Sequence, residues 1–287
     1  MAKKYYCLVA GLPDILLSDK KVLFTSIALR EMLQEEVVEQ DFSMVKALYL
    51  PFDHYNLINL LYQQQKEFDP RGNYTTLELE PLTDKKHLEA LEGNDFPSYI
   101  IDFANKILFA EETIEKVKAE VILFKMYTDY LKSFSNTFLS DFLQFEINQK
   151  NIFTALTGRK YEMEYATELI GSGDVVDALI KSRSRDFGLA NELEYTESLI
   201  QIYEEENILE RELKVDRLKW NYLDESTFFN YFTIERVLAF VYKLQIVERW
   251  IALDEEEGKK MFQKLLSELE SSYEFPEEYK LRHGKKE

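Results

Sequence analysis

The 287-residue sequence has little of the chemistry from which catalytic and metal sites are usually built. It contains one cysteine and three histidines, with no Cys pair and no His pair at metal-ligand spacing. It also lacks a phosphate-binding loop and a dinucleotide-binding fingerprint. We therefore expect no catalytic residue, no metal site and no bound cofactor. Catalysis by carboxylates alone stays open, because the chain has 53 acidic residues.

Proline and glycine are scarce, with six and nine residues. Not one proline occurs between Ser98 and Phe275. This scarcity argues against disorder, collagen-like repeats and turn-rich β sandwiches. With 46% hydrophobic residues to fill a core, the sequence predicts an all-α fold built from long helices.

Basic residues and long apolar runs are also few. Lys and Arg number 35, and the net charge is −18, which opposes binding to nucleic acid. No apolar run reaches the ~18 to 20 residues that span a bilayer, and the start of the chain lacks a signal-peptide pattern. We expect a cytoplasmic protein with no direct membrane span. Cys7 stands in an apolar run and is expected to be buried.

Capping residues and prolines set the expected helix boundaries. The opening, Lys3 to Asp14, predicts a short extended segment. Thr25 is the expected N-cap of a helix over Ser26–Val38, and the next helix is expected to end near Leu50 because Pro51 follows. Further helices are predicted at Asp53–Gln65, Thr83–Leu91, Thr113–Ser133, Asn136–Thr157, Val175–Ser182, Leu189–Tyr203, Asn207–Asn221, Ser226–Ile251 and Glu255–Ser271. We expect a single helical domain over residues 1–287, with a sub-boundary near residues 66–97, where turn residues cluster.

Three segments share a polar pattern on one helix face. Each has two polar residues three positions apart, followed at once by an apolar residue. The segments are Asp53-His54-Tyr55-Asn56-Leu57, Asn148-Gln149-Lys150-Asn151-Ile152 and Asp216-Arg217-Leu218-Lys219-Trp220. The pattern predicts three similar helical units. Coincidence is the alternative, because such pairs are common in amphipathic helices and the intervals between the segments are unequal.

The middle segment and its surroundings resemble a known family. Phe145 to Ile152, followed by Gly158-Arg159 and then Leu169 to Asp174, resembles the central signature of the C subunit of V-type and A-type rotary ATPases, also called the d subunit. Asn230 to Glu235 resembles the closing helices of that family. Lys3 to Asp14 resembles the start of its shorter bacterial branch. The sequence departs from the family at Asn148, where Asp is frequent, and at Thr157, where a basic residue is common.

This resemblance implies a non-catalytic part of the ATPase central stalk, shaped as a funnel of three helical units. Such a protein couples the D and F subunits of the stalk to the membrane proteolipid ring during proton or sodium transport, and lies peripheral to the inner membrane. The residues expected to carry the family signature are Asp53, Asn56, Glu146, Asn148, Asn151, Arg159, Gly171, Gly173 and Asp216. Two alternatives remain: an unrelated acidic helical adaptor, or a carboxylate-based, metal-dependent enzyme.

Overall fold

The computed structural model describes residues 3–89 and 96–253, and within these ranges the chain forms helices and no β-strand. The predicted all-α fold class is confirmed. The α-helices are α1 (Tyr6–Gly11), α2 (Ser26–Glu36), α3 (Glu39–Leu61), α4 (Thr76–Leu79), α5 (Lys85–Glu89), α6 (Ser98–Leu108), α7 (Lys116–Lys132), α8 (Thr137–Tyr161), α9 (Asp174–Lys181), α10 (Thr196–Tyr203), α11 (Ile208–Ser226) and α12 (Ile234–Ala252). Two 3₁₀ helices, Glu80–Thr83 and Ala166–Glu168, complete the set. The predicted helix Glu255–Ser271 lies outside the described residues.

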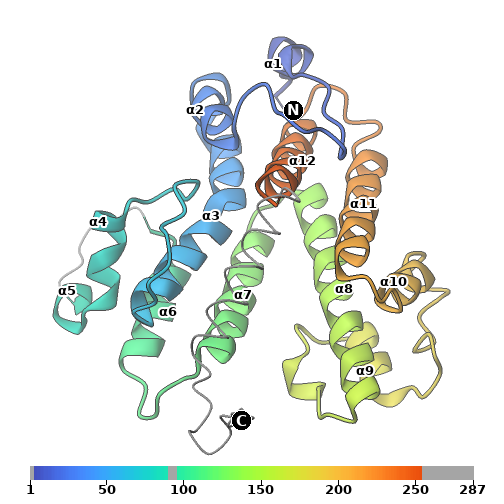
Figure 1. Cartoon of the computed structure of the whole chain (residues 1–287). Helices are drawn as coiled ribbons and strands as arrows, with labels where there is room; N and C mark the ends of the chain where they lie inside the picture. The colour runs from blue at the N-terminus through green and yellow to red at the C-terminus, as the bar shows by residue number, and fades with distance from the viewer. Residues whose placement is uncertain (1–2, 90–95, 254–287) are drawn as a thin grey trace, which may run out of the picture.

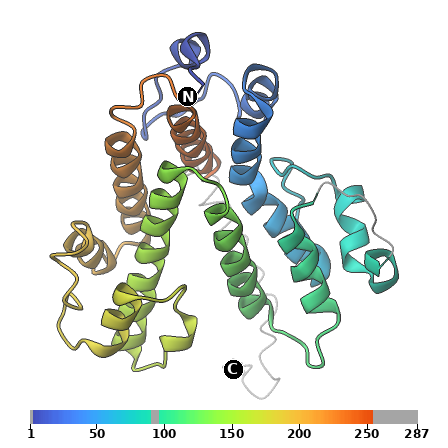
Figure 2. The same cartoon turned by 180° about the vertical axis from the view of Figure 1, so that it is seen from behind.

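The helices are arranged as two arms that diverge from a common top (Figure 1). One arm contains α3 with α4, α5 and α6, and the other contains α8 with α9 and α10. Helices α1 and α2 and the connection between α11 and α12 lie at the top, and α7 and α12 lie between the arms. The view from behind shows the same arrangement (Figure 2).

Three clusters of buried apolar side chains hold these parts together. The cluster at the top joins α2, α3, α8 and α12, while each arm has a cluster of its own. Helix α3 contributes Leu48 to the top cluster and Leu57 to its arm. Helix α8 contributes Phe142 to the top cluster and Ile152 to the other arm. Because each of these two helices buries side chains in the top cluster and in the cluster of an arm, α3 and α8 connect the arms to the top.

Helix α3 passes through Pro51, where the sequence predicted a break. Proline has no N–H, so the carbonyl of Ala47 loses its usual partner within the helix. The hydroxyl of Tyr127 donates a hydrogen bond to that carbonyl at 3.1 Å. A side chain from α7 thus satisfies the group that proline leaves free, which is why the prediction was wrong.

The start of the chain also differs from the prediction, because residues 6–11 form α1 instead of an extended segment. Tyr5 and Leu8, three positions apart, face the top cluster. Cys7 stands on the other side and is exposed, so its predicted burial was wrong.

Two predicted helices begin too early. The predicted helix from Ser226 starts only at Ile234, because α11 runs on to Ser226 and the chain then turns, with the N–H of Asn230 bonded to the carbonyl of Thr227 at 2.9 Å. The predicted helix from Leu189 starts at Thr196, after a turn in which Gly188 has φ +77°. Among the described helices, none combines the length and apolar character needed to cross a membrane.

Candidate functional site

Asp53, predicted from the sequence, anchors the loop that follows α3. Its side chain is buried, and its carboxylate accepts hydrogen bonds from the backbone N–H of Asn73 at 2.9 Å and of Tyr74 at 3.0 Å. The side-chain amide of Asn73 donates a third bond at 2.8 Å. Burial raises the pKa of Asp53 to about 6, and these bonds together with nearby Arg30 partly oppose the shift. Asp53 is thus a structural acceptor held in a dry environment.

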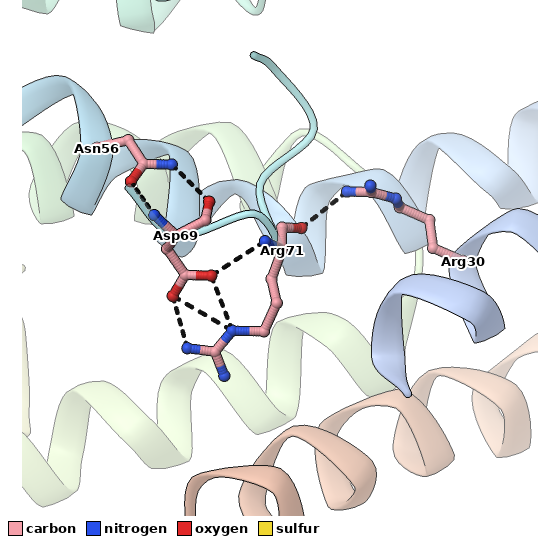
Figure 3. Close-up of polar contacts among 4 residues, drawn as sticks. All are labelled: Arg30, Asn56, Asp69 and Arg71. Carbon is pink, nitrogen blue, oxygen red and sulfur yellow. Dashed lines mark hydrogen bonds and ion pairs between the residues drawn. The ribbon is translucent and has the colours of Figure 1, made fainter. Parts of the chain in front are cut away.

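Residues 69–74, here called the Arg71 loop, are held by Asn56 and Arg30, and Asp69 pairs with Arg71 within the loop (Figure 3). The Asn56 side chain donates to the Asp69 carbonyl at 2.9 Å and accepts from the Asp69 N–H at 2.8 Å. The Asp69 carboxylate pairs with the Arg71 guanidinium, with Nη2 2.6 Å from Oδ2. Arg30 on α2 donates to the carbonyls of Arg71 and Gly72 at 2.8 and 2.6 Å. The loop is therefore bonded to both α2 and α3.

Asn151 on α8 makes the same contact as Asn56 does on α3. Its side chain donates to the carbonyl of Ile170 and accepts from the N–H of Ile170, both at 2.8 Å. Asn148, one turn earlier, donates to the Tyr195 hydroxyl at 2.9 Å. In both arms, a polar side chain of the long helix thus clamps the backbone of a later loop.

The other residues predicted in this arm are structural as well. Gly171 and Gly173 have φ of +83° and +110°, a backbone region that favours glycine, and they lead the chain into α9. Arg159 donates to the carbonyls of Ser182 and Ser184, and its guanidinium lies 3.7 Å from the centre of the Phe187 ring. These residues shape the far end of the arm.

The third predicted position behaves differently. Asp216 on α11 is buried and accepts from the Trp250 indole N–H at 2.6 Å and from Arg249, both on α12. Lys219 donates to Glu146 on α8 at 2.9 Å. Burial would lower the pKa of Lys219, but the Glu146 carboxylate outweighs burial and raises it. These contacts join helices and do not clamp a loop, so the threefold repeat stays a prediction.

The Lys219–Glu146 and Asp216–Arg249 ion pairs line a central cavity of about 530 Å³ between the arms. Side chains from α3, α7, α8, α11 and α12 line it. One of them is His54, whose Nε2 lies 2.6 Å from the Tyr99 hydroxyl and whose ring meets the Tyr99 and Tyr127 rings edge-on. Burial lowers the pKa of His54 to about 3, so its ring is neutral at physiological pH. The cavity wall therefore carries its charges as pairs.

The predicted residues do not converge on one site. Asp53 and Asn56 lie at the Arg71 loop, Glu146 and Asp216 at the central cavity, and the other five toward or along the α8 arm. Across residues 3–89 and 96–253, no three His, Cys, Asp or Glu side chains gather in a way that could hold a metal ion. What this arrangement provides chemically is a set of hydrogen bonds and ion pairs that fix loops and helices.

A family model described as "Protein of unknown function (DUF2764)" matches residues 1–273. The chain belongs to this DUF2764 family. No curated protein and no solved structure matches it. The family match overturns the resemblance to the rotary ATPase C subunit. The central segment that carried it is a short pattern of an amphipathic helix followed by a glycine turn. In the structure Asn151 of this helix clamps Ile170, and the glycines lead the chain into α9.

Several residues of this DUF2764 chain that shape the site were missed. Arg30 gave no sequence signal, because a lone Arg in an amphipathic helix is usually solvated. Arg71 stood in a predicted turn, yet its pairing with Asp69 depends on the loop geometry. Lys219 was seen as part of the third segment, but its partner Glu146 lies 73 positions away.

Proposed function

We propose that this chain is a non-catalytic helical scaffold that acts by binding other proteins within a larger assembly. One observation carries the proposal most directly: the polar side chains at the predicted positions bond to the chain's own loops and helices. Asn56 and Asn151 each use both polar atoms of the side chain on one backbone residue. Such contacts favour a fixed shape, which a docking protein needs.

The charges around the central cavity support the same interpretation. Glu146 is paired with Lys219, and Asp216 with Arg249. Side chains held in this way are preorganised, and preorganised polar surface gives specificity to protein contacts. The excess of 18 negative charges over the whole chain favours partners with basic surfaces.

The role inferred from the sequence is one specific form of this proposal. In that form the scaffold couples the D and F subunits of an ATPase stalk to the membrane proteolipid ring, at the membrane periphery. The role no longer has support from family membership, and it stands as a prediction about partners. An unrelated adaptor would have the same kind of scaffold and different partners.

Capture of the tagged full-length chain from its native cells tests the proposal. After gentle cross-linking, we expect a partner that co-elutes with the chain in size-exclusion chromatography at a fixed ratio. An unrelated tagged acidic helical protein is the control. Recovery of the stalk proteins or of the ring would identify the coupling role, and recovery of other defined partners would identify an adaptor. A chain that always elutes alone would overturn the scaffold function.

A further inference from the structure

A groove of about 900 Å³ lies where α2, α3, the Arg71 loop and α12 meet. We call it the α3–α12 groove. Its apolar lining includes Ile27, Pro51, Phe52, Phe68, Pro70 and Ile251. Its volume lies in the range of ~300 to 1,000 Å³ that is typical of ligand sites. Its walls come from helices that pack in the top cluster and from the Arg71 loop, which is bonded to α2 and α3.

The charges that line the groove are unbalanced. Its charged residues are Glu67, Asp69, Arg71 and Glu248. Arg71 is already occupied, since Asp69 pairs with its guanidinium and the Phe52 ring lies 4.1 Å below it. In the part of the chain that the structure describes, neither Glu67 nor Glu248 has an ion-pair partner. Among the described residues that line the groove, Arg71 is thus the one cation against three acids, and it serves both its partner Asp69 and the nearby Glu248.

Glu248 is the more informative of the two acids. Its Oε1 accepts a hydrogen bond from the backbone N–H of Ser26 at 2.6 Å, which fixes the side chain against the start of α2. Its Oε2 is buried and has no hydrogen-bond partner among the described residues. One hydrogen bond is little compensation for a partly buried carboxylate, so a cation that a ligand brings to the groove would be attracted to Glu248.

We propose that the α3–α12 groove binds an apolar segment of a partner protein and that a Lys or Arg of this segment pairs with the Glu248 carboxylate at the groove wall. The inference rests on the scaffold function and names one of its docking surfaces. The apolar floor accepts the partner's apolar side chains, and the excess of acids over bases in the lining selects for a cation. The 53 acids against 35 bases in the chain favour a basic partner as well.

A direct test uses two synthetic amphipathic helical peptides of about 18 residues, or five helical turns. One contains Leu and Lys, and the other contains Leu and Glu. Binding to the full-length chain is followed by fluorescence anisotropy of a dye on the peptide. We expect the Lys peptide to bind and the Glu peptide not to bind. Equal binding of the two peptides would overturn the proposal.

The variant E248Q locates the contact, because Gln keeps an acceptor for the Ser26 N–H and removes the charge. We expect it to bind the Lys peptide about tenfold more weakly than the wild type, as for loss of a hydrogen bond to a charged group. The matched control is E31Q, which removes the same charge from an exposed position on α2 and should bind like the wild type. Equal weakening by E248Q and E31Q would show diffuse attraction to an acidic surface and refute the groove.

A second variant keeps the test decisive if E248Q alters the fold. Ile251→Lys places a cation at the groove wall and should weaken binding of the Lys peptide with no change at Glu248. Competition by hexylamine at the same concentration as the peptide would instead indicate a site for small amines and overturn the proposed protein segment.

Capture from native cells separates this proposal from the scaffold function. If the wild type and E248Q recover the same partner equally well, the groove assignment fails and the scaffold function stands. If the wild type recovers no partner, the scaffold function fails. The peptide measurements alone then test whether the groove binds a basic apolar segment.

Discussion

Gly72 lies so close to Asp53 that a Cβ added to residue 72 would be only 2.3 Å from the carboxylate Oδ1. The same carboxylate accepts hydrogen bonds from the two residues after Gly72. The backbone of the Arg71 loop can thus reach the buried acid only because residue 72 has no side chain. Real Cβ atoms do not approach other atoms this closely, so the loop and the acid are fitted to each other.

Gly72→Ala should therefore lower the free energy of unfolding. Either Asp53 moves and loses hydrogen bonds, or the loop moves away from α3, and we expect a loss of about 2 kcal/mol or more. Urea denaturation followed by circular dichroism measures it. The control is Gly11→Ala, since nothing lies within 4 Å of a Cβ at that position, and its stability should stay within about 0.5 kcal/mol of the wild type. Equal effects of the two substitutions would contradict the close fit.

Asp53 should make the protein less stable as the pH rises. Its pKa is about 6 in the fold and 3.8 in the reference state, so the fold holds the proton more tightly than the unfolded chain does. The contribution of Asp53 to the free energy of unfolding is fully present below about pH 4 and is lost as the pH rises through 6, a change on the order of 3 kcal/mol. Urea denaturation of the wild type and of Asp53→Asn from pH 4 to 7 measures it. We expect the wild-type stability, relative to the variant, to fall across this range, and parallel profiles would refute it.

The adjacent residue, His54, should act in the opposite direction. Burial lowers its pKa to about 3 from 6.5, so the fold resists protonation of the ring. The contribution of His54 to the free energy of unfolding is present above about pH 6.5 and is lost as the pH falls toward 3. His54→Phe keeps an aromatic ring beside Tyr99 and Tyr127 and should lose less stability on acidification than the wild type. The same urea series detects this. A wild type that tolerates acid as well as His54→Phe would contradict a neutral, half-buried His54.

Sequence reasoning succeeded where the determinants are local. The N-cap at Thr25 and the start of α8 after Asn136 follow from neighbouring residues, and both side chains accept the expected backbone N–H. The break predicted at Pro51 was wrong because the compensating hydroxyl belongs to Tyr127, about 80 residues away. No local pattern contains that information.

The site shows the same division. Asp53, Asn56 and Asn151 were singled out by their spacing on helix faces, and the structure places all three in buried contacts. Their actual role, as clamps on loops 13 to 21 residues later, was not predicted. The spacing places side chains on one face of a helix, but the tertiary fold decides what that face meets.

The two asparagine clamps offer a test of this role. Asn56→Ala and Asn151→Ala each remove a double hydrogen bond and leave the backbone N–H and C=O of a loop residue without their partner, so each should cost about 2 kcal/mol. Asn221→Ala, at an exposed position of α11, is the matched control and should change little. Hydrogen exchange should speed up at Asp69 in the first variant and at Ile170 in the second. Uniform exchange changes would argue against local clamps.

The contact of Arg249 with Asp216 gives the sharpest test of the central cavity. The Asp216 side chain is only 4% exposed, and Arg249→Met would leave its charge with the Trp250 indole N–H as the remaining donor among the described residues. Because the Arg249 side chain is 43% exposed, water can reach part of the vacated space, and we expect a loss of about 2 kcal/mol instead of the ~3 to 5 typical of a fully buried pair. Asp216→Asn in the Arg249→Met background removes the uncompensated charge and should restore part of the loss. Trp250 is one of only two tryptophans in the chain, so fluorescence during urea denaturation reports on this region. If the double variant is no more stable than Arg249→Met, an unpaired charge is not the cause of the loss, and the cavity wall owes its stability to packing.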